Sequence, residues 1–115
     1  MDQEIKKQWL AALKSGQYRQ GKYSLQTSSQ EFCCLGVLCD LAVKAKIIPE
    51  PLLPGPEGVG YQYGLDGRSG FLPTEVYRWA GLDGPYPRIA DTDLSVLNDN
   101  GTSFNEIAAL IERYL

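Results

Sequence analysis

The sequence predicts a mainly helical α+β fold with a buried central helix and a small antiparallel sheet. Residues 32–46, FCCLGVLCDLAVKAK, form the longest nearly continuous apolar run. Wound as a helix at about 100° per residue, this run leaves only Asp40 and Lys44 as a polar edge. Such a helix is normally buried, so we expect the other elements to surround it. Apolar stripes at helical spacing near both ends of the chain, and tyrosines alternating with polar residues elsewhere, supply those elements.

The first expected helix spans residues 2–15. Its apolar stripe consists of Ile5, Trp9, Ala12 and Leu13, and Gly16 supplies a left-handed stop. This pattern is typical of an amphipathic helix lying on a core.

A hairpin or irregular loop with strand character is expected next. Residues 18–25 interleave aromatic and polar side chains, and we expect them to form the small sheet with residues 61–65. Ser28 or Ser29 is a candidate cap of the central helix, with Glu31 in its first turn.

Prolines and glycines dominate residues 47–60, which we expect to form an extended surface loop. Asp66-Gly67 then predicts a tight turn in a short hairpin. A helix with Pro73 in its first turn follows, and Gly81 ends it.

The last third of the chain carries clear local signals. Residues 93–98 suit either a helical turn or a strand, and we favour the turn. Ser103 and Glu106 form a capping box that opens a final helix. Its apolar stripe predicts that this helix packs on the central one.

Size and charge limit the possible classes of protein. A chain of 115 residues is one expected domain, 1–115, able to fold without metal or disulfide support. The net charge of −3 argues against a protein that binds genomic nucleic acid by phosphate neutralisation. No apolar run approaches a membrane span, so we expect no membrane partner and a cytoplasmic protein.

The three cysteines, Cys33, Cys34 and Cys39, all lie on the central helix pattern. They point in different directions along a helix, which disfavours a disulfide or a shared metal. The chain has no histidine, so the usual base partner of a nucleophilic thiol is missing. We therefore expect core cysteines, no metal and no cofactor.

Tyrosines and arginines recur together outside the apolar stripes. Aromatic faces stack on bases, and guanidinium groups bind phosphates. The same tyrosines could instead close the rim of a small core. The candidate ligand-binding residues are Tyr18, Arg19, Tyr61, Tyr63, Arg68, Tyr86 and Arg88.

Two other patterns suggest chemistry less strongly. The segment 64–70 has three glycines and an arginine before a helix, but it lacks the Walker lysine pattern. Aspartates in the last third could serve as acids or bases, although aspartate is favoured in turns for backbone reasons. These aspartates are Asp83, Asp91, Asp93 and Asp99.

Several motifs together resemble a family. They are W-x-x-A-L-x-S-G at 9–16, CCLGVLCDLA at 33–42, LP-x-x-V-x-x-W-A-G-L at 72–82 and L-N-D-x-G-x-S-F-x-x-I-A-x-x-I-E at 97–112. In this combination the chain resembles small, largely uncharacterised proteins encoded by bacteriophages and prophages. The resemblance implies a phage accessory protein acting inside a bacterial cell, and it supplies no catalytic residues.

Three functions are compatible with these observations. We expect a noncatalytic binding protein, such as a homo-oligomeric anti-defence sponge that sequesters a nucleotide-derived immune signal. The alternatives are a small phosphodiesterase or hydrolase acting on such a signal, and a module that binds a host protein or belongs to the virion. The sequence favours binding over catalysis, because it lacks histidine.

Overall fold

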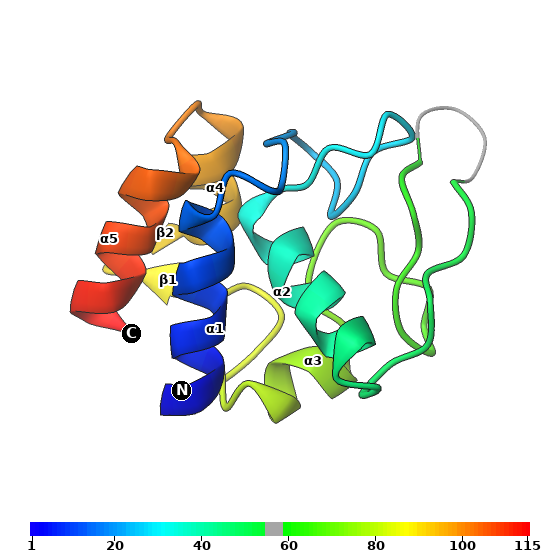
Figure 1. Ribbon diagram of the computed structural model, residues 1–115, viewed down its shortest axis with the longest axis horizontal. Helices are drawn as coiled ribbons and strands as arrows, with labels where there is room; N and C mark the ends of the chain where they lie inside the picture. Colours follow the sequence, from blue (N-terminus) through cyan, green and yellow to red (C-terminus); the bar gives the residue numbers. More distant parts are fainter. Residues whose placement is uncertain (55–58) are drawn as a thin grey trace.

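The computed structural model describes residues 1–54 and 59–115. These residues form five helices and one two-stranded antiparallel sheet (Figure 1). The mainly helical α+β fold is therefore confirmed. In chain order the elements are α1 (Gln3–Lys14), α2 (Cys34–Lys44), α3 (Thr74–Trp79), β1 (Arg88–Ile89), β2 (Thr92–Asp93), α4 (Leu94–Asp99) and α5 (Phe104–Tyr114).

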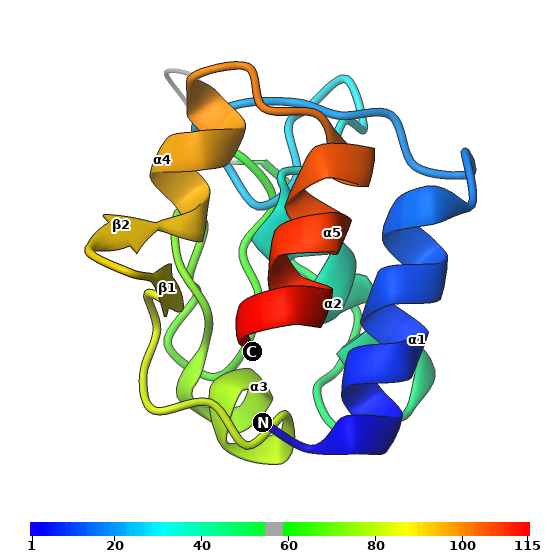
Figure 2. The ribbon, with the colours of Figure 1, turned by 90° about the vertical axis from the view of Figure 1, so that its left-hand side faces the viewer.

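Helix α2 is the central element, as its apolar sequence predicts. In Figure 2, α5 lies between α1 and α4, and α2 lies behind them. On its polar edge Asp40 is half-buried and Lys44 is exposed, as expected. The buried residues of α2 are Cys34, Leu35, Gly36, Val37, Leu38, Cys39 and Ala42.

The start of α2 differs from the prediction. Its N-cap is Cys33, which makes no side-chain capping bond. Ser28, Ser29 and Glu31 precede the helix, in a turn where Thr27 accepts hydrogen bonds from the backbone N–H groups of residues 30 and 31. The predicted caps are therefore wrong. A distant side chain takes the role, because Asn98 Oδ1 accepts a 3.1 Å hydrogen bond from the Cys34 N–H.

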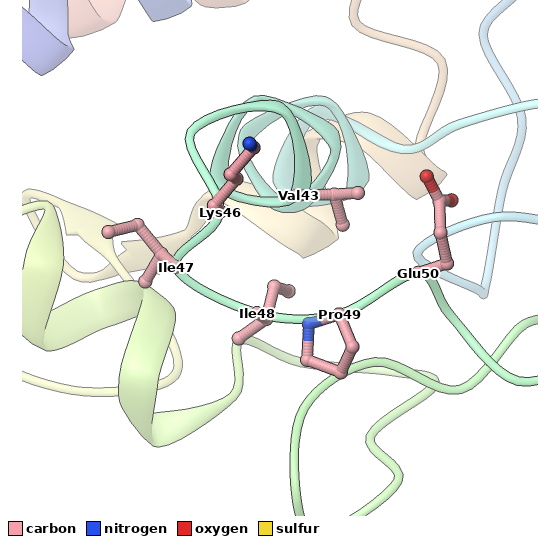
Figure 3. A pocket seen from close by; sticks show the side chains of 6 residues that line it. All are labelled: Val43, Lys46, Ile47, Ile48, Pro49 and Glu50. Atoms are coloured by element: carbon pink, nitrogen blue, oxygen red, sulfur yellow. The ribbon is translucent and has the colours of Figure 1, made fainter.

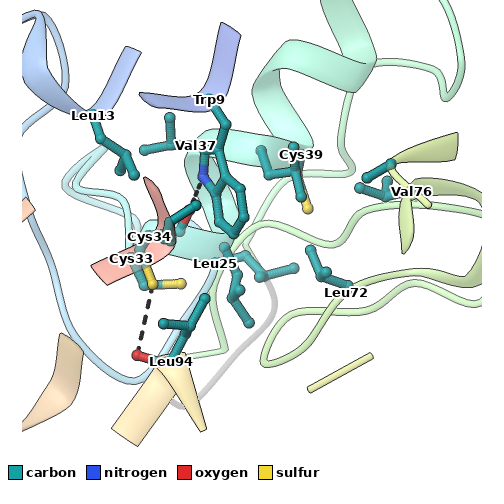
Figure 4. Packing of buried hydrophobic residues seen from close by; sticks show 14 of the residues in the cluster. Trp9, Leu13, Leu25, Cys33, Cys34, Val37, Cys39, Leu72, Val76 and Leu94 are labelled. Carbon is teal, nitrogen blue, oxygen red and sulfur yellow. Dashed lines mark hydrogen bonds between the residues drawn. The ribbon is translucent and has the colours of Figure 1, made fainter. Parts of the chain in front are cut away.

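Trp9 joins α1 to the start of α2. Its side chain is fully buried, and its indole Nε1 donates a 3.0 Å hydrogen bond to the Cys34 carbonyl oxygen (Figure 4). A buried indole N–H needs such a partner, because leaving it unpaired is costly. Of the apolar stripe predicted for the first helix, Ile5, Trp9 and Leu13 are buried in the core. The fourth member, Ala12, is half-buried.

Side chains cap both terminal helices. Asp2 Oδ1 accepts from the Ile5 N–H at 3.0 Å, and Ser103 Oγ accepts from the Glu106 N–H at 3.2 Å. The Ser103 hydroxyl also donates to the Glu106 carboxylate at 3.0 Å. The predicted helix start is therefore confirmed. We expected α5 to pack on the central helix, but its most extensive contact with another helix is the one with α1.

The sheet lies elsewhere than predicted. Residues 18–25 and 61–65 form only single-residue bridges, among them Gln20 with Phe32 and Tyr63 with Arg68. The sheet is instead the hairpin of β1 and β2, with Arg88 opposite Asp93 and Ile89 opposite Thr92. Its turn contains Ala90 at φ +54°. Nothing in the turn sequence signals a hairpin, because no glycine or asparagine occupies that left-handed position.

The shorter predictions are mostly correct. The hairpin turn before Arg68 forms, since Tyr63 and Arg68 exchange backbone hydrogen bonds of 2.7 and 2.8 Å. Helix α3 follows Pro73, and α4 is the helical turn favoured at residues 93–98. The predicted loop at 47–60 is free of helix and strand in its described part, except for a bridge between Leu52 and Gln62. Residues 55–58 of that loop lie outside the described residues.

None of the helices in the described residues has the length and apolarity that crossing a membrane requires.

Candidate functional site

The seven residues expected to bind ligand do not form one cluster. Tyr18 and Arg19 line one hollow, and Tyr86 and Arg88 line another. Arg68 and Tyr86 both contact the ring of Phe71. Tyr61 is half-buried, and its backbone N–H bonds to the Gln26 carbonyl oxygen at 2.9 Å.

Tyr63 is a core residue. Its side chain is 1% exposed, and its hydroxyl donates a 2.5 Å hydrogen bond to the side-chain oxygen of Gln26. Burial raises the pKa of this phenol well above its usual value. The ring offers no face to a ligand arriving from solvent, so Tyr63 serves the fold.

A hollow that combines aromatic and arginine side chains lies between two loops. We call it the Tyr18 pocket; it measures about 450 Å³ and is lined by Gln17, Tyr18, Arg19, Ser28, Ser29, Gln30 and Phe32. Backbone hydrogen bonds hold its two walls together: the Phe32 N–H donates to the Arg19 carbonyl oxygen, and the Gly21 N–H donates to the Phe32 carbonyl oxygen, each at 2.8 Å. These hydrogen bonds therefore hold the two loops side by side along one edge of the pocket, which sets its shape.

Two rings and a guanidinium group meet in this pocket. The Tyr18 and Phe32 rings pack edge to face with their centroids 5.1 Å apart, and both side chains are half-exposed. The Arg19 Nη2 donates a 2.8 Å hydrogen bond to the Ser29 carbonyl oxygen across the pocket. Since a guanidinium group carries five N–H donors, Arg19 retains donors for a ligand.

Helix α2 positions Tyr18. The Tyr18 hydroxyl donates to Asp40, and Lys44 Nζ donates to that hydroxyl at 3.2 Å and to Asp40 at 3.1 Å. Burial, followed by the hydrogen bond to Asp40, raises the pKa of Tyr18, although Lys44 opposes the shift. The hydrogen bonds that Lys44 makes with Tyr18 and with Asp40 raise the pKa of Lys44. Tyr18 therefore remains a neutral phenol near pH 7, fixed in orientation and poorly suited to act as a base.

A second aromatic group lies near the sheet. The Arg68 guanidinium carbon is 4.5 Å from the centre of the Phe71 ring, and that ring is 5.1 Å from Tyr86. Arg68 also pairs with Asp66 at 3.3 Å, and its buried Nε has no hydrogen-bond partner among the residues that the structure describes. Phe71, absent from the sequence-based candidates, joins the two residues that the sequence could only place on separate loops.

The hollow beside Tyr86 is small, about 210 Å³. Arg88 lines it but is already engaged, because its Nε pairs with Asp93 at 2.9 Å and its Nη2 donates to the Asp91 carbonyl oxygen at 2.9 Å. Pockets for drug-sized ligands measure about 300–1,000 Å³. The Tyr18 pocket fits this range and the hollow beside Tyr86 does not.

The hollow shown in Figure 3 has a different character. It measures about 490 Å³ and is lined by Val43 and by Lys46 through Glu50, one nearly continuous stretch. It contains no aromatic ring and no arginine, and the charged groups of Lys46 and Glu50 stand apart in the view. This hollow contains none of the residues that the sequence singled out for ligand binding.

The three cysteines are core residues, as predicted. Cys33, Cys34 and Cys39 are buried, and Cys34 Sγ lies 3.7 Å from the Leu94 carbonyl oxygen that it bonds (Figure 4). Burial raises the pKa of Cys33 to about 11, and those of Cys34 and Cys39 well above their usual value. Protonated, enclosed thiols are poor nucleophiles. In the part of the chain that is described, no group of three or more acidic, cysteine or histidine side chains is arranged to hold a metal ion.

Asn98 makes several buried hydrogen bonds, although the sequence did not single it out as a candidate residue. Asn98 is fully buried, and its Oδ1 accepts from Gln20 Nε2 at 2.9 Å as well as from Cys34. Its Nδ2 donates to the Gly21 carbonyl oxygen at 2.8 Å. The only sequence signal was an asparagine in a stripe of leucines, which a turn explains equally well. Asn98 stabilises the fold and touches none of the pockets described above.

Comparison with known proteins bears on the family. No curated protein and no solved structure matches the chain. A family model matches residues 1–115, the whole length of the sequence. The chain therefore belongs to the family described as Domain of unknown function (DUF8296).

Proposed function

We propose that the protein is a noncatalytic binding protein that captures a nucleotide-type ligand in the Tyr18 pocket. One observation carries the proposal: a hollow of about 450 Å³ that combines the Tyr18 and Phe32 rings with the Arg19 guanidinium group. Its residue types and volume suit such a ligand, whereas the hollow beside Tyr86 is too small and the hollow in Figure 3 has no ring or arginine among its lining residues.

Each part of the pocket suits one part of a nucleotide. A base stacks on or against the accessible parts of the two aromatic rings, with each stacked base contributing about 1–3 kcal/mol. Arg19 binds a phosphate through its remaining N–H donors. The hydroxyl groups of Ser28 and Ser29, both exposed at the pocket, suit the sugar hydroxyls.

Preorganisation supports a binding role. The Tyr18 ring is held by Asp40 and Lys44 on α2, and the loop carrying Phe32 is bonded to the loop carrying Arg19. A pocket whose rings are already oriented loses little conformational entropy when the ligand enters.

The proposal favours capture over conversion of the ligand. The sequence lacks histidine, the thiols are buried with raised pKa values, and Tyr18 is a neutral phenol near pH 7. These groups supply neither a general base near neutrality nor an activated nucleophile.

The biological setting is also a proposal. The motifs at 9–16, 33–42, 72–82 and 97–112 support a bacteriophage accessory protein acting in the bacterial cytoplasm. In that setting, capturing a nucleotide-derived immune signal would suppress a host defence, and a homo-oligomer would present several pockets at once.

Binding is tested by isothermal titration calorimetry and thermal shift with cyclic oligonucleotides and ADP-ribose derivatives. We expect at least one ligand to bind, and Arg19→Gln to weaken it at least about tenfold, the loss of one charge-assisted contact. Arg78→Gln, a matched change at an exposed arginine of α3, leaves the affinity unchanged.

Two results would contradict the proposal. Failure of every ligand to bind would remove the nucleotide-type function. A loss of binding in Arg68→Gln but not in Arg19→Gln would place the site at Phe71 and Tyr86 instead. Chromatography of ligand released by denaturation separates the hydrolase alternative, because a binding protein returns its ligand intact.

A further inference from the structure

The outer face of α5 carries a further hollow that the proposed ligand site does not use. It measures about 330 Å³ and is lined by Thr102, Glu106, Ala109, Leu110, Arg113 and Tyr114. Figure 2 looks onto this helix, on the outside of the molecule. We call the surface formed by residues 106, 109, 110, 113 and 114 the outer α5 face. The core-facing residues of α5 are Phe104, Ile107, Ala108 and Ile111.

Apolar groups occupy the middle of this face, and opposite charges occupy its two ends. In the middle, Ala109 is exposed and small and Leu110 is half-buried beside it. Tyr114, 57% exposed, follows Arg113 at the C-terminal end. Glu106 lies one helical repeat of seven residues before Arg113, so the two charges share one side of the helix. Among the described residues, the ion pairs formed include neither Glu106 nor Arg113.

This arrangement is complementary to itself. If a second copy of α5 lies antiparallel across a twofold axis that passes between positions 109 and 110, Glu106 meets Arg113 of the partner subunit. Symmetry repeats the pair with the roles exchanged, because a twofold interface brings the same patch of both subunits together. Ala109 then faces Leu110 of the partner subunit, and the small side chain allows the helices to approach closely.

We propose that the outer α5 face is the interface of a homodimer, in which two copies of α5 pack antiparallel and exchange two Glu106–Arg113 ion pairs. A second copy fits this face because reversing the helix exchanges the positions of the negative and the positive charge. Each charge therefore meets the opposite charge of the other copy. The interface comprises little more than one short helix on each subunit, so the dimer is weak, with a dissociation constant on the order of 100 µM.

Charge reversal tests the proposal by sedimentation velocity over a range of protein concentrations. Arg113→Glu and Glu106→Lys each convert two attractive contacts into two repulsive ones, and each weakens the dimer at least about tenfold. Mixing the two variants restores association, because in the heterodimer Lys meets Glu at one contact and Glu106 meets Arg113 at the other. Arg78→Glu, the same charge change on α3, leaves the dimer as it is in the wild type.

One further variant guards against a folding artefact. Glu106→Lys removes the carboxylate that accepts from Ser103 at the start of α5, so circular dichroism must show that its helix content is retained. Ala109→Glu touches neither the cap nor the core and places like charges beside the axis, so it also yields a monomer. A wild type that stays monomeric at millimolar concentration, or variants that associate like the wild type, would overturn the proposal. Ligand binding in the Tyr18 pocket would stand in either case.

Discussion

The side-chain oxygen Oδ1 of Asn98 accepts a 3.1 Å hydrogen bond from the backbone N–H of Cys34, a residue 64 positions earlier in the chain. A helix begins with backbone N–H groups that have no partner in the helix, and a local serine, threonine, aspartate or asparagine usually satisfies one of them. In this protein Cys33 stands at the N-cap and makes no side-chain capping bond, and α4 supplies the acceptor. The central helix is therefore capped only once the tertiary structure has formed.

Asn98→Ala is expected to destabilise the protein by at least about 2 kcal/mol, because it leaves a buried donor at Cys34 and a buried acceptor at Gly21 unpaired. Urea denaturation followed by circular dichroism measures the free energy of unfolding. Asn105→Ala, at an exposed position of α5, is the matched control and should change stability by less than about 0.5 kcal/mol. Equal effects of the two changes would contradict the capping role of Asn98.

Gly36→Ala is expected to prevent folding or to destabilise the protein by about 3 kcal/mol or more. A Cβ atom at residue 36 would lie 1.7 Å from the Leu25 carbonyl oxygen, so α2 or the backbone of the facing loop would have to move. Gly70→Ala offers a matched comparison: an added Cβ there meets nothing within 4 Å, and Gly70 does not have positive φ. We expect Gly70→Ala to be neutral or slightly stabilising. Thermal denaturation of both variants provides the measurement. A stable Gly36→Ala protein would show that the close approach of α2 to the Leu25 backbone is not needed for folding.

Stability should fall as the pH rises from about 9 to 11. The Cys33 thiol has an ordinary pKa of 9.0, which burial raises to about 11 in the folded protein. Below pH 9 the thiol is protonated in both states, and its contribution to stability is complete. Above pH 9 the unfolded chain releases the proton first, so the free energy of unfolding decreases.

Cys33→Ala isolates that contribution. Its free energy of unfolding between pH 8 and 11 should decline less steeply than that of the wild type, whereas other groups titrate alike in both proteins. Urea denaturation at several pH values measures the two slopes. Parallel slopes would mean that the Cys33 thiol ionises alike in the folded and unfolded states.

The sequence predicted the types of side chain at the candidate site, but not the full set of residues that line it. Tyr18 and Arg19 are adjacent in sequence, so their joint presence at one pocket follows from the chain. Phe32 and Ser29 join them only because backbone hydrogen bonds align two loops. The sequence pattern also grouped Tyr63 with tyrosines that solvent reaches at least in part, but packing buries its ring and Gln26 satisfies its hydroxyl. A tyrosine's sequence neighbours do not reveal whether its ring faces solvent.

Local patterns were sufficient for the helices. The stripe of Ile5, Trp9 and Leu13, the apolar run of α2 and the Ser103 cap each act over a few residues, so the sequence alone located α1, α2 and α5. The tertiary structure decided the rest: where α2 begins, which segments form the sheet, and which side chains surround each pocket. Those features depend on contacts between residues far apart in the chain, as between Asn98 and Cys34, and such contacts arise from packing that no local periodicity encodes.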